Sequence, residues 1–153
     1  MFELIFNFME KIGIYKHVDL IIPYIYIGNL NISQDYHFIK ENNIKLIVNC
    51  SRHIPFIENW DCEKVRIPID DNRIFKNNDI LKYLDILEKI DEYRRSKQNI
   101  LIHCRAGSQR SANIILLYLT KNLKIDFETS YNILKLKRPI CFSPSNSFSH
   151  IYT

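Results

Sequence analysis

Residues 103–111 bring a thiol and a guanidinium together around a short loop. An apolar stretch ends at His103 and Cys104, five residues follow, and Arg110 and Ser111 then open an apolar helical stretch. The backbone N–H groups of such a loop can point inward, and the N-terminal end of the helix adds positive potential. Arg110 can clamp two oxygens of a phosphate group, and the same field favours the thiolate form of Cys104. The pattern therefore predicts attack of Cys104 on the phosphorus of a bound phosphate ester.

Small residues gather in the loop that would surround the anion. Both alanines of the chain, Ala106 and Ala112, lie in or beside it, as does Gly107, one of only three glycines. Small residues allow a loop to curl tightly around a ligand. The predicted phosphate-binding residues are Arg105, Ala106, Gly107, Ser108, Gln109 and Arg110.

The run His-Cys-(x)5-Arg-Ser resembles the signature of the protein tyrosine phosphatases, and its flanking residues resemble the small dual-specificity phosphatases. Further anchors occur in the order of that family between about residues 18 and 148. Six ordered anchors are far more specific than a cysteine and an arginine at this spacing. The anchors outside the loop are Tyr26-Ile27-Gly28-Asn29, residues 46–49, residues 67–72, and Arg138-Pro139 with Ser143-Pro144, which resemble the segment that supports the phosphate loop in the family.

The resemblance gives roles to two neighbours of the nucleophile Cys104. His103 would orient the cysteine and the loop without transferring a proton. Ser111 would donate a hydrogen bond to the sulfur and ease departure of the thiolate. From its place at the start of a helix, Ser111 also fits a helix N-cap, and the two roles are compatible.

A general acid is needed to protonate the leaving oxygen of the substrate. Residues 67–72 resemble the loop that supplies this acid in the family, and the position of the family's carboxylate matches Asp71. Asp70 is the alternative, and its simpler role is to form a turn with Asn72. Asp71 would later act as the base for the water that hydrolyses the phosphocysteine.

The sequence departs from the family pattern at two places. Ser108-Gln109 stand where the family more often has an apolar residue followed by a small one. Phe142 looks inserted, Ser145 occupies the place of a usual asparagine, and Asn146 comes one place late. The departure at Ser108-Gln109 leaves the stiffness of the loop and the substrate preference open, but it does not affect the chemistry.

Length and composition are those of one globular domain. The chain has 153 residues, 25% of them charged, and a net charge of +4. This charge would steer anionic substrates weakly and is far from that of a nucleic-acid-binding protein. No apolar run has the length of a transmembrane helix. Four cysteines without paired or metal-ligand spacing indicate a reducing compartment, so we expect a cytoplasmic protein without metal or cofactor.

Two further expectations concern the origin of the chain and its redox chemistry. The bias toward Ile, Asn and Lys is typical of an AT-rich genome, for example that of a virus or protist. A viral protein of this kind would act in the host cytoplasm or the virion. Cys50 ends a strand predicted to neighbour that of Cys104, so an oxidised pair is conceivable. The simpler role of Cys50 is to fill apolar space.

Hydrophobic periodicity predicts a single α/β domain. Its central, mainly parallel twisted sheet of about five strands would be flanked by helices, as in protein tyrosine phosphatases. An amphipathic arm, residues 1–17, would precede a catalytic domain, residues 18–153. The apolar stripe of the arm would pair with a second copy, giving a homodimer, or pack on its own domain. The predicted strands are 18–22, 24–28, 44–49, 64–69 and 99–103, and the predicted helices are 33–42, 78–96, 109–122 and 127–137.

The resemblance implies an enzyme that dephosphorylates phosphotyrosine and phosphoserine/threonine proteins. A shallow pocket would accept both, because the long insertion and phosphotyrosine-recognition loop of the large tyrosine-specific enzymes are lacking. An RNA 5′-triphosphatase is the first alternative, although it would want a more basic surface. A phosphoinositide phosphatase would want lysines in the loop, where only Arg105 stands. A phosphoprotein-binding pseudophosphatase would usually lack Cys104 or Arg110, and both are present.

Overall fold

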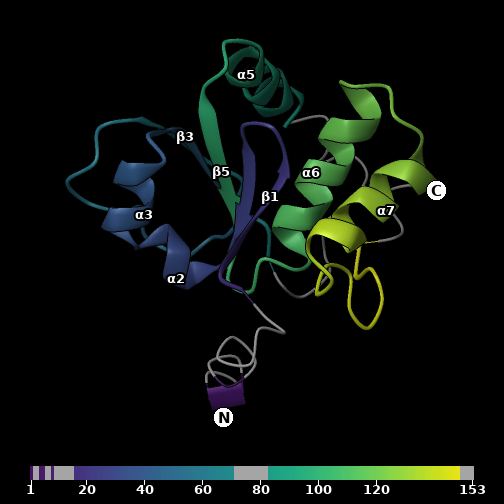
Figure 1. Cartoon of the computed structure of the whole chain (residues 1–153), viewed down its shortest axis with the longest axis horizontal. Helices are drawn as coiled ribbons and strands as arrows, with labels where there is room; N and C mark the ends of the chain where they lie inside the picture. The colour runs from purple at the N-terminus through teal and green to yellow at the C-terminus, as the bar shows by residue number, and fades with distance from the viewer. Residues whose placement is uncertain (2–3, 6–7, 9–15, 71–82, 149–153) are drawn as a thin grey trace.

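A five-stranded sheet crosses the molecule, with helices packed on both of its faces (Figure 1). This is the single α/β domain that the sequence predicts. The computed structural model describes residues 1, 4–5, 8, 16–70 and 83–148.

The strand order of the sheet is β1-β2-β5-β3-β4. β2, β5, β3 and β4 pair in parallel, and only the edge strand β1 runs antiparallel, to β2. The prediction of a mainly parallel sheet of about five strands is confirmed, and β5 lies at its centre. The strands are β1 (Val18–Ile22), β2 (Ile25–Gly28), β3 (Ile44–Asn49), β4 (Glu63–Arg66) and β5 (Asn99–His103).

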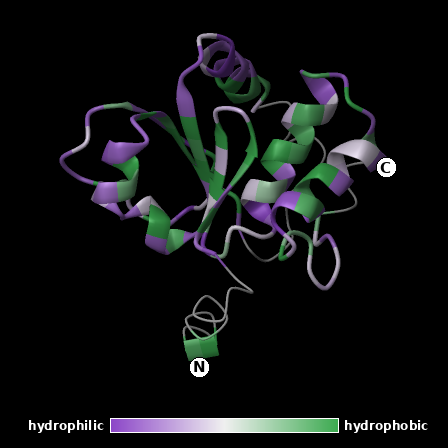
Figure 2. Ribbon diagram, in the orientation of Figure 1, coloured by the Kyte–Doolittle hydropathy of each residue, from purple (hydrophilic) through white to green (hydrophobic). Residues whose placement is uncertain are grey.

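Alternating side chains of β5 point to the two faces of the sheet. Ile100 and Ile102 pack in the larger core, which α5, α6 and α7 cover. Leu101 packs in a smaller core under α2 and α3. Figure 2 shows the hydrophobic side of α6 turned toward the sheet. The helices are α2 (Leu30–Ser33), α3 (Tyr36–Glu41), α5 (Leu84–Arg95), α6 (Arg110–Lys121) and α7 (Phe127–Lys137).

The predicted helix 33–42 is shorter than expected, as α3, and a further short helix that the sequence analysis did not predict, α2, precedes it. The Asn29 side chain accepts a hydrogen bond of 3.1 Å from the N–H of Ile32 and caps α2. The Asp35 side chain accepts one of 3.0 Å from the N–H of Phe38 and caps α3. Each cap fixes a helix start, because it satisfies an N–H that has no partner within the helix.

Other boundaries differ from the prediction by a few residues. β4 ends at Arg66, earlier than predicted, because its partner β3 ends at Asn49. Tyr24 has a φ of 75° in the turn between β1 and β2, so β2 begins at Ile25. Residues 78–82 of the predicted helix before β5 lie outside the described residues. The two helices that follow β5 lie where the sequence predicts them.

Three parallel strands end together at one edge of the sheet. His103, the last residue of β5, pairs with Gly28 of β2 on one side and with Asn49 of β3 on the other. Residues that follow these strands therefore meet at this edge. Cys104 and Cys50 are both among them, as the sequence predicts.

Most of the predicted N-terminal arm, residues 1–17, lies outside the described residues. Its division from residues 18–153 and its part in a homodimer therefore stay predictions. Among the described residues, no helix is long and apolar enough to cross a membrane.

Candidate active site

Cys104 follows β5 and is nearly buried, with 2% of its surface exposed. Its Sγ lies 3.2 Å from Oγ of Ser111 and accepts a hydrogen bond of 3.3 Å from the N–H of Gly107. α6 begins at Arg110, with Gln109 as its N-cap residue. The expectation that Ser111 caps this helix is therefore wrong. Its hydroxyl lies beside the sulfur instead, where it can donate a hydrogen bond.

The carbonyl oxygens of loop residues 105–109 all accept hydrogen bonds from groups beyond the loop. The donors belong to the start of α2, the end of α7, the segment after α7 and the first turn of α6. They are Leu30 N–H to Arg105 (3.0 Å), Arg138 Nη2 to Ala106 (3.2 Å), Arg138 Nε to Gly107 (2.7 Å), Phe142 N–H to Ser108 (2.9 Å) and Asn113 N–H to Gln109 (2.9 Å).

These contacts determine where the loop's N–H groups point. In a planar trans peptide, the carbonyl of one residue and the N–H of the next point in opposite directions. Outward carbonyls at 105–109 therefore turn the N–H groups of 106–110 inward, and the Gly107 N–H on the Cys104 sulfur is a direct instance. The positive end of α6 faces the same space. Such a ring of N–H groups is suited to binding an oxyanion.

Gly107 is required by the tight path of the loop. Its φ is +64°, and a Cβ built on it would lie 2.6 Å from the carbonyl oxygen of Gly28. A side chain would therefore clash with backbone as well as strain the conformation. Gly28 belongs to the Tyr26–Asn29 anchor, so two anchors that are far apart in sequence are in contact here.

Arg110 links the loop to the segment that follows β4 and leads into the candidate acid segment. Its guanidinium is largely buried, with the residue 8% exposed, and Nη1 donates a hydrogen bond of 3.2 Å to the carbonyl of Ile69. The charge of Arg110 is therefore held inside the protein, against the segment that leads to Asp70, and not in solvent. Its bidentate binding to a phosphate held in the loop stays a prediction.

Asp70 forms an ion pair with Arg52. The Nε and Nη2 atoms of Arg52 donate hydrogen bonds of 2.9 and 3.1 Å to its two carboxylate oxygens. Hydrogen bonds from Arg52 hold the pKa of Asp70 below its ordinary value. A carboxyl kept ionised in this way is a poor proton donor at neutral pH. Asp71, the preferred acid, lies outside the described residues.

His103 is buried and neutral. Burial lowers its pKa to about 4, although a hydrogen bond with the Cys104 backbone opposes the shift. Its Nδ1 is buried without a hydrogen-bond partner among the described residues. A neutral, enclosed imidazole agrees with the expectation that His103 supports the loop and transfers no proton.

Two more thiols lie close to the loop. Burial raises the pKa of Cys50 well above its ordinary value, and the charge of Cys104 adds to the rise. Burial also raises the pKa of Cys141 to about 12, with a smaller contribution from Cys104. Both thiols are therefore protonated at neutral pH. All four cysteines are free, so the pairing of Cys50 with Cys104 stays a prediction.

Sequence reasoning missed the way in which two residues hold the loop. Arg138 is 1% exposed and donates to two loop carbonyls, whereas the resemblance places it only within a segment that supports the loop. The side chain of Gln109 reaches out of the loop, to Ser143 and Ser145. For Gln109, the available signal was a large polar residue at a position where the family pattern has a small one.

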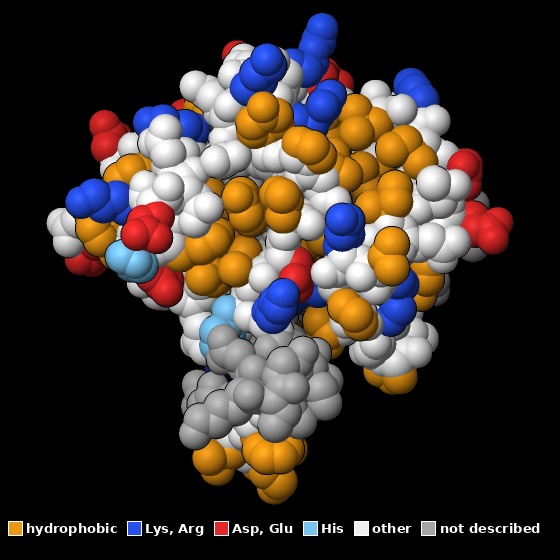
Figure 3. Space-filling view, viewed as in Figure 1, with side chains coloured by type: hydrophobic (Ala, Val, Ile, Leu, Met, Phe, Trp, Pro, Cys, Tyr) orange, Lys and Arg blue, Asp and Glu red, His pale blue; other side chains and the backbone are white. Residues whose placement is uncertain are grey.

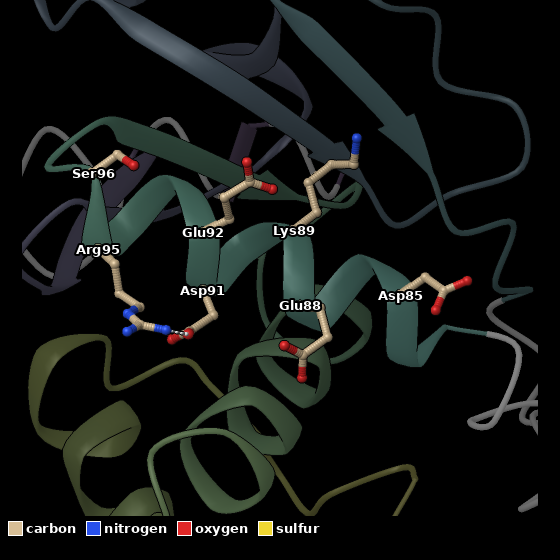
Figure 4. Close-up of a pocket in the computed structure, with 7 residues that line it drawn as sticks. All are labelled: Asp85, Glu88, Lys89, Asp91, Glu92, Arg95 and Ser96. Carbon is tan, nitrogen blue, oxygen red and sulfur yellow. Dashed lines mark ion pairs between the residues drawn. The ribbon is translucent and has the colours of Figure 1, made fainter.

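The pocket drawn in Figure 4 is not part of this site. Side chains of α5 line it, and Arg95 is paired with Asp91 there at 3.6 Å. Its carboxylates outnumber its cations, which disfavours a phosphate ligand. Lys and Arg side chains on the face shown in Figure 3 are scattered over several elements. The pocket is lined by Asp85, Glu88, Lys89, Asp91, Glu92, Arg95 and Ser96.

Comparisons with known proteins identify the family of the chain. The family described as "Dual specificity phosphatase, catalytic domain" matches residues 25–152, and the chain belongs to that family. It is 32% identical over 131 residues to dual specificity protein phosphatase 8 of Mus musculus, covering 84% of this chain and 19% of that one. It is 29% identical over 128 residues to dual specificity protein phosphatase 2 of Mus musculus, covering 84% and 39%. The chain thus spans well under half the length of these relatives.

Solved structures give the same fold. The crystal structure of human DUSP28 superposes with a TM-score of 0.76 at 17% identity, covering 82% of this chain and 84% of that one. Identity at this level shows the fold alone. The sheet and the flanking helices therefore have the arrangement seen in that structure.

Proposed function

We propose that the chain hydrolyses phosphate monoesters on phosphotyrosine and phosphoserine/threonine proteins through a phosphocysteine at Cys104. The ring of inward N–H groups at residues 106–110, closing on the Cys104 sulfur, carries this proposal. It offers a phosphoryl group several donors at the point where the nucleophile lies. Membership of the dual-specificity phosphatase family supports the same reaction.

The reaction has two steps. The Cys104 thiolate forms a bond to phosphorus as the bond to the leaving oxygen breaks, and Asp71 gives that oxygen a proton. Arg110 and the loop N–H groups bind the charged phosphoryl oxygens in both steps. A water, deprotonated by Asp71, then attacks the phosphocysteine, and inorganic phosphate leaves. Ser111 stabilises the departing thiolate through the 3.2 Å contact between Oγ and Sγ.

The proposal extends to the cellular compartment and the partners of the chain. We infer that the protein is cytoplasmic, which the four free cysteines support. The partners are phosphorylated proteins, and no metal is needed for the steps above. Among the described residues, no group of His, Cys, Asp and Glu could hold a metal ion.

A substrate comparison tests the function. Phosphotyrosyl and phosphothreonyl peptides, a phosphoinositide and a 5′-triphosphorylated RNA are offered at equal concentrations, and released phosphate is measured. We expect both peptides to have the highest kcat/KM values, because the chain shows neither lysines in the loop nor a strongly basic composition. Faster release from the phosphoinositide or the RNA would replace the proposed substrate class with that one. Binding without any release would indicate a pseudophosphatase.

Replacing Asp71 with asparagine should lower kcat for peptides by about a hundredfold, because positioned acid catalysis contributes at least that much. KM should change little. The activity of the wild type should fall at high pH, where the acid is deprotonated, and this limb of the pH profile should disappear in Asp71→Asn.

Asp70→Asn is the matched control for this prediction. It removes a neighbouring carboxylate whose bidentate contact is with Arg52, and the pair is exposed to solvent. We expect less than about a fivefold loss of kcat, in keeping with the small contribution of exposed ion pairs. A large loss in Asp70→Asn with none in Asp71→Asn would assign the acid to Asp70.

A further inference from the structure

The side chain of Gln109 joins the phosphate loop to the segment after α7 through three hydrogen bonds. Nε2 donates to the carbonyl of Ser143 at 3.3 Å and to that of Ser145 at 2.9 Å. Oε1 accepts from the N–H of Ser147 at 3.0 Å. One amide group therefore satisfies three backbone groups of residues 143–147. A small side chain at position 109 could not reach them.

The extra residue in this segment also contacts the loop. Phe142 has a φ of 61°, and its N–H donates to the carbonyl of Ser108 at 2.9 Å. Its ring is buried and stacks on Tyr131, with ring centres 4.8 Å apart and planes 14° apart. Stacking holds the backbone of Phe142 where it meets the loop. The residue that interrupts the sequence pattern thus supplies one of the outward contacts of the loop.

A pair of asparagines anchors the far side of the same segment. The amides of Asn113 and Asn146 exchange two hydrogen bonds, of 3.0 and 3.1 Å. Asn113 also donates from its backbone and its side chain to the carbonyl of Gln109, at 2.9 and 2.8 Å. The backbone of Gln109, its side chain and Asn146 therefore belong to one closed network.

We propose that Gln109 is a positioning residue that holds the phosphate loop and residues 143–147 as one unit. The inference rests on the proposed function and concerns the same site. Gln109 directly precedes Arg110, so fixing both its carbonyl and its side chain fixes the peptide whose N–H belongs to Arg110. That peptide supplies the last inward N–H of the loop and begins α6. If the side chain were lost, the Arg110 end of the loop would be less well ordered for the anion.

The test uses Gln109→Ser, which introduces the small residue more usual in the family pattern. Binding of inorganic phosphate is measured in a Cys104→Ser background, so that turnover does not interfere. Exchange of the Ser147 amide proton is followed in the same samples. We expect phosphate to bind about tenfold more weakly, equivalent to about 1.4 kcal/mol, and the Ser147 amide to lose protection. In the catalytically intact chain, KM should rise more than kcat falls.

Two further variants distinguish a loss of loop positioning from a general loss of structure. Asn146→Ala loosens the same segment from the other side, so its effect on phosphate binding should be less than additive with that of Gln109→Ser. Gln98→Ser replaces an exposed glutamine before β5 and should leave phosphate binding unchanged.

Failure of the positioning role and failure of the proposed function give different results. If the parent binds phosphate and Gln109→Ser binds it equally well, the positioning role is wrong and the proposed function stands. Retained protection at Ser147 would also overturn the role, because the hydrogen bond to Gln109 would then be dispensable. A parent that binds no phosphate overturns both the proposed function and this inference.

Discussion

Replacing Cys104 with serine should abolish hydrolysis of every phosphorylated substrate and leave phosphate binding intact. The sulfur accepts the Gly107 N–H at 3.3 Å and lies 3.2 Å from the Ser111 hydroxyl, so it is inside the ring of donors. A serine hydroxyl is not ionised at neutral pH and cannot replace a thiolate as nucleophile. The contacts that turn the loop carbonyls outward use backbone atoms of residues 105–109 and do not involve the Cys104 side chain.

Phosphate release and phosphopeptide binding are measured on the same Cys104→Ser protein. We expect release below detection and a dissociation constant within about threefold of the wild-type value, which is about 0.65 kcal/mol. Cys62→Ser is the control, because Cys62 is a partly buried cysteine that packs against the smaller core under α2 and α3. It should keep full activity. Turnover by Cys104→Ser at a rate near that of the wild type would exclude a phosphocysteine.

The loop at residues 103–111 could be predicted from the sequence because its parts are contiguous. The cysteine, the small residues and the arginine follow one another closely, so their types and their order together indicate an anion-binding turn. The central strands could be predicted for a similar reason, since a short run of apolar residues is a local pattern. Local order of this kind gives the order of elements and the edge of the sheet at which Cys104 lies.

The contacts that shape the loop could not be predicted, because their partners are distant in sequence. Arg138 reaches the carbonyl of Lys16, which is 122 positions away, as well as Gly107. Nothing in the local pattern around Arg138 indicates which carbonyls it satisfies. The starts of α2 and α3 are different, because their capping residues Asn29 and Asp35 are visible in the sequence.

Replacing Arg138 with methionine should disable the site and destabilise the fold together. The guanidinium is buried, with Nη1 2.8 Å from a carboxylate oxygen of Asp19. Nε and Nη2 hold the carbonyls of Gly107 and Ala106 at 2.7 and 3.2 Å. Removing one partner of a buried ion pair commonly costs about 3–5 kcal/mol, because the other charge is left without compensation. Here the freed carbonyls would also no longer be held outward.

Denaturant unfolding and phosphate affinity report the two effects separately. We expect Arg138→Met to lose about 3–5 kcal/mol in the free energy of unfolding. Its phosphate affinity, measured where the variant is still folded, should fall by more than about tenfold. Arg138→Lys keeps the charge but offers no planar fork, so it should recover part of the stability and little of the affinity.

Two comparisons show whether the loss of affinity comes from the loop. Asp19→Asn weakens the ion pair but leaves the bonds from Arg138 to the loop, so it should lower stability more than phosphate affinity. Arg95→Met removes an exposed arginine on α5 and should change neither quantity. If Arg138→Met bound phosphate as well as the wild type does, outward carbonyls would not be needed to form the anion site. The ring of inward N–H groups would then have to be maintained by the loop alone.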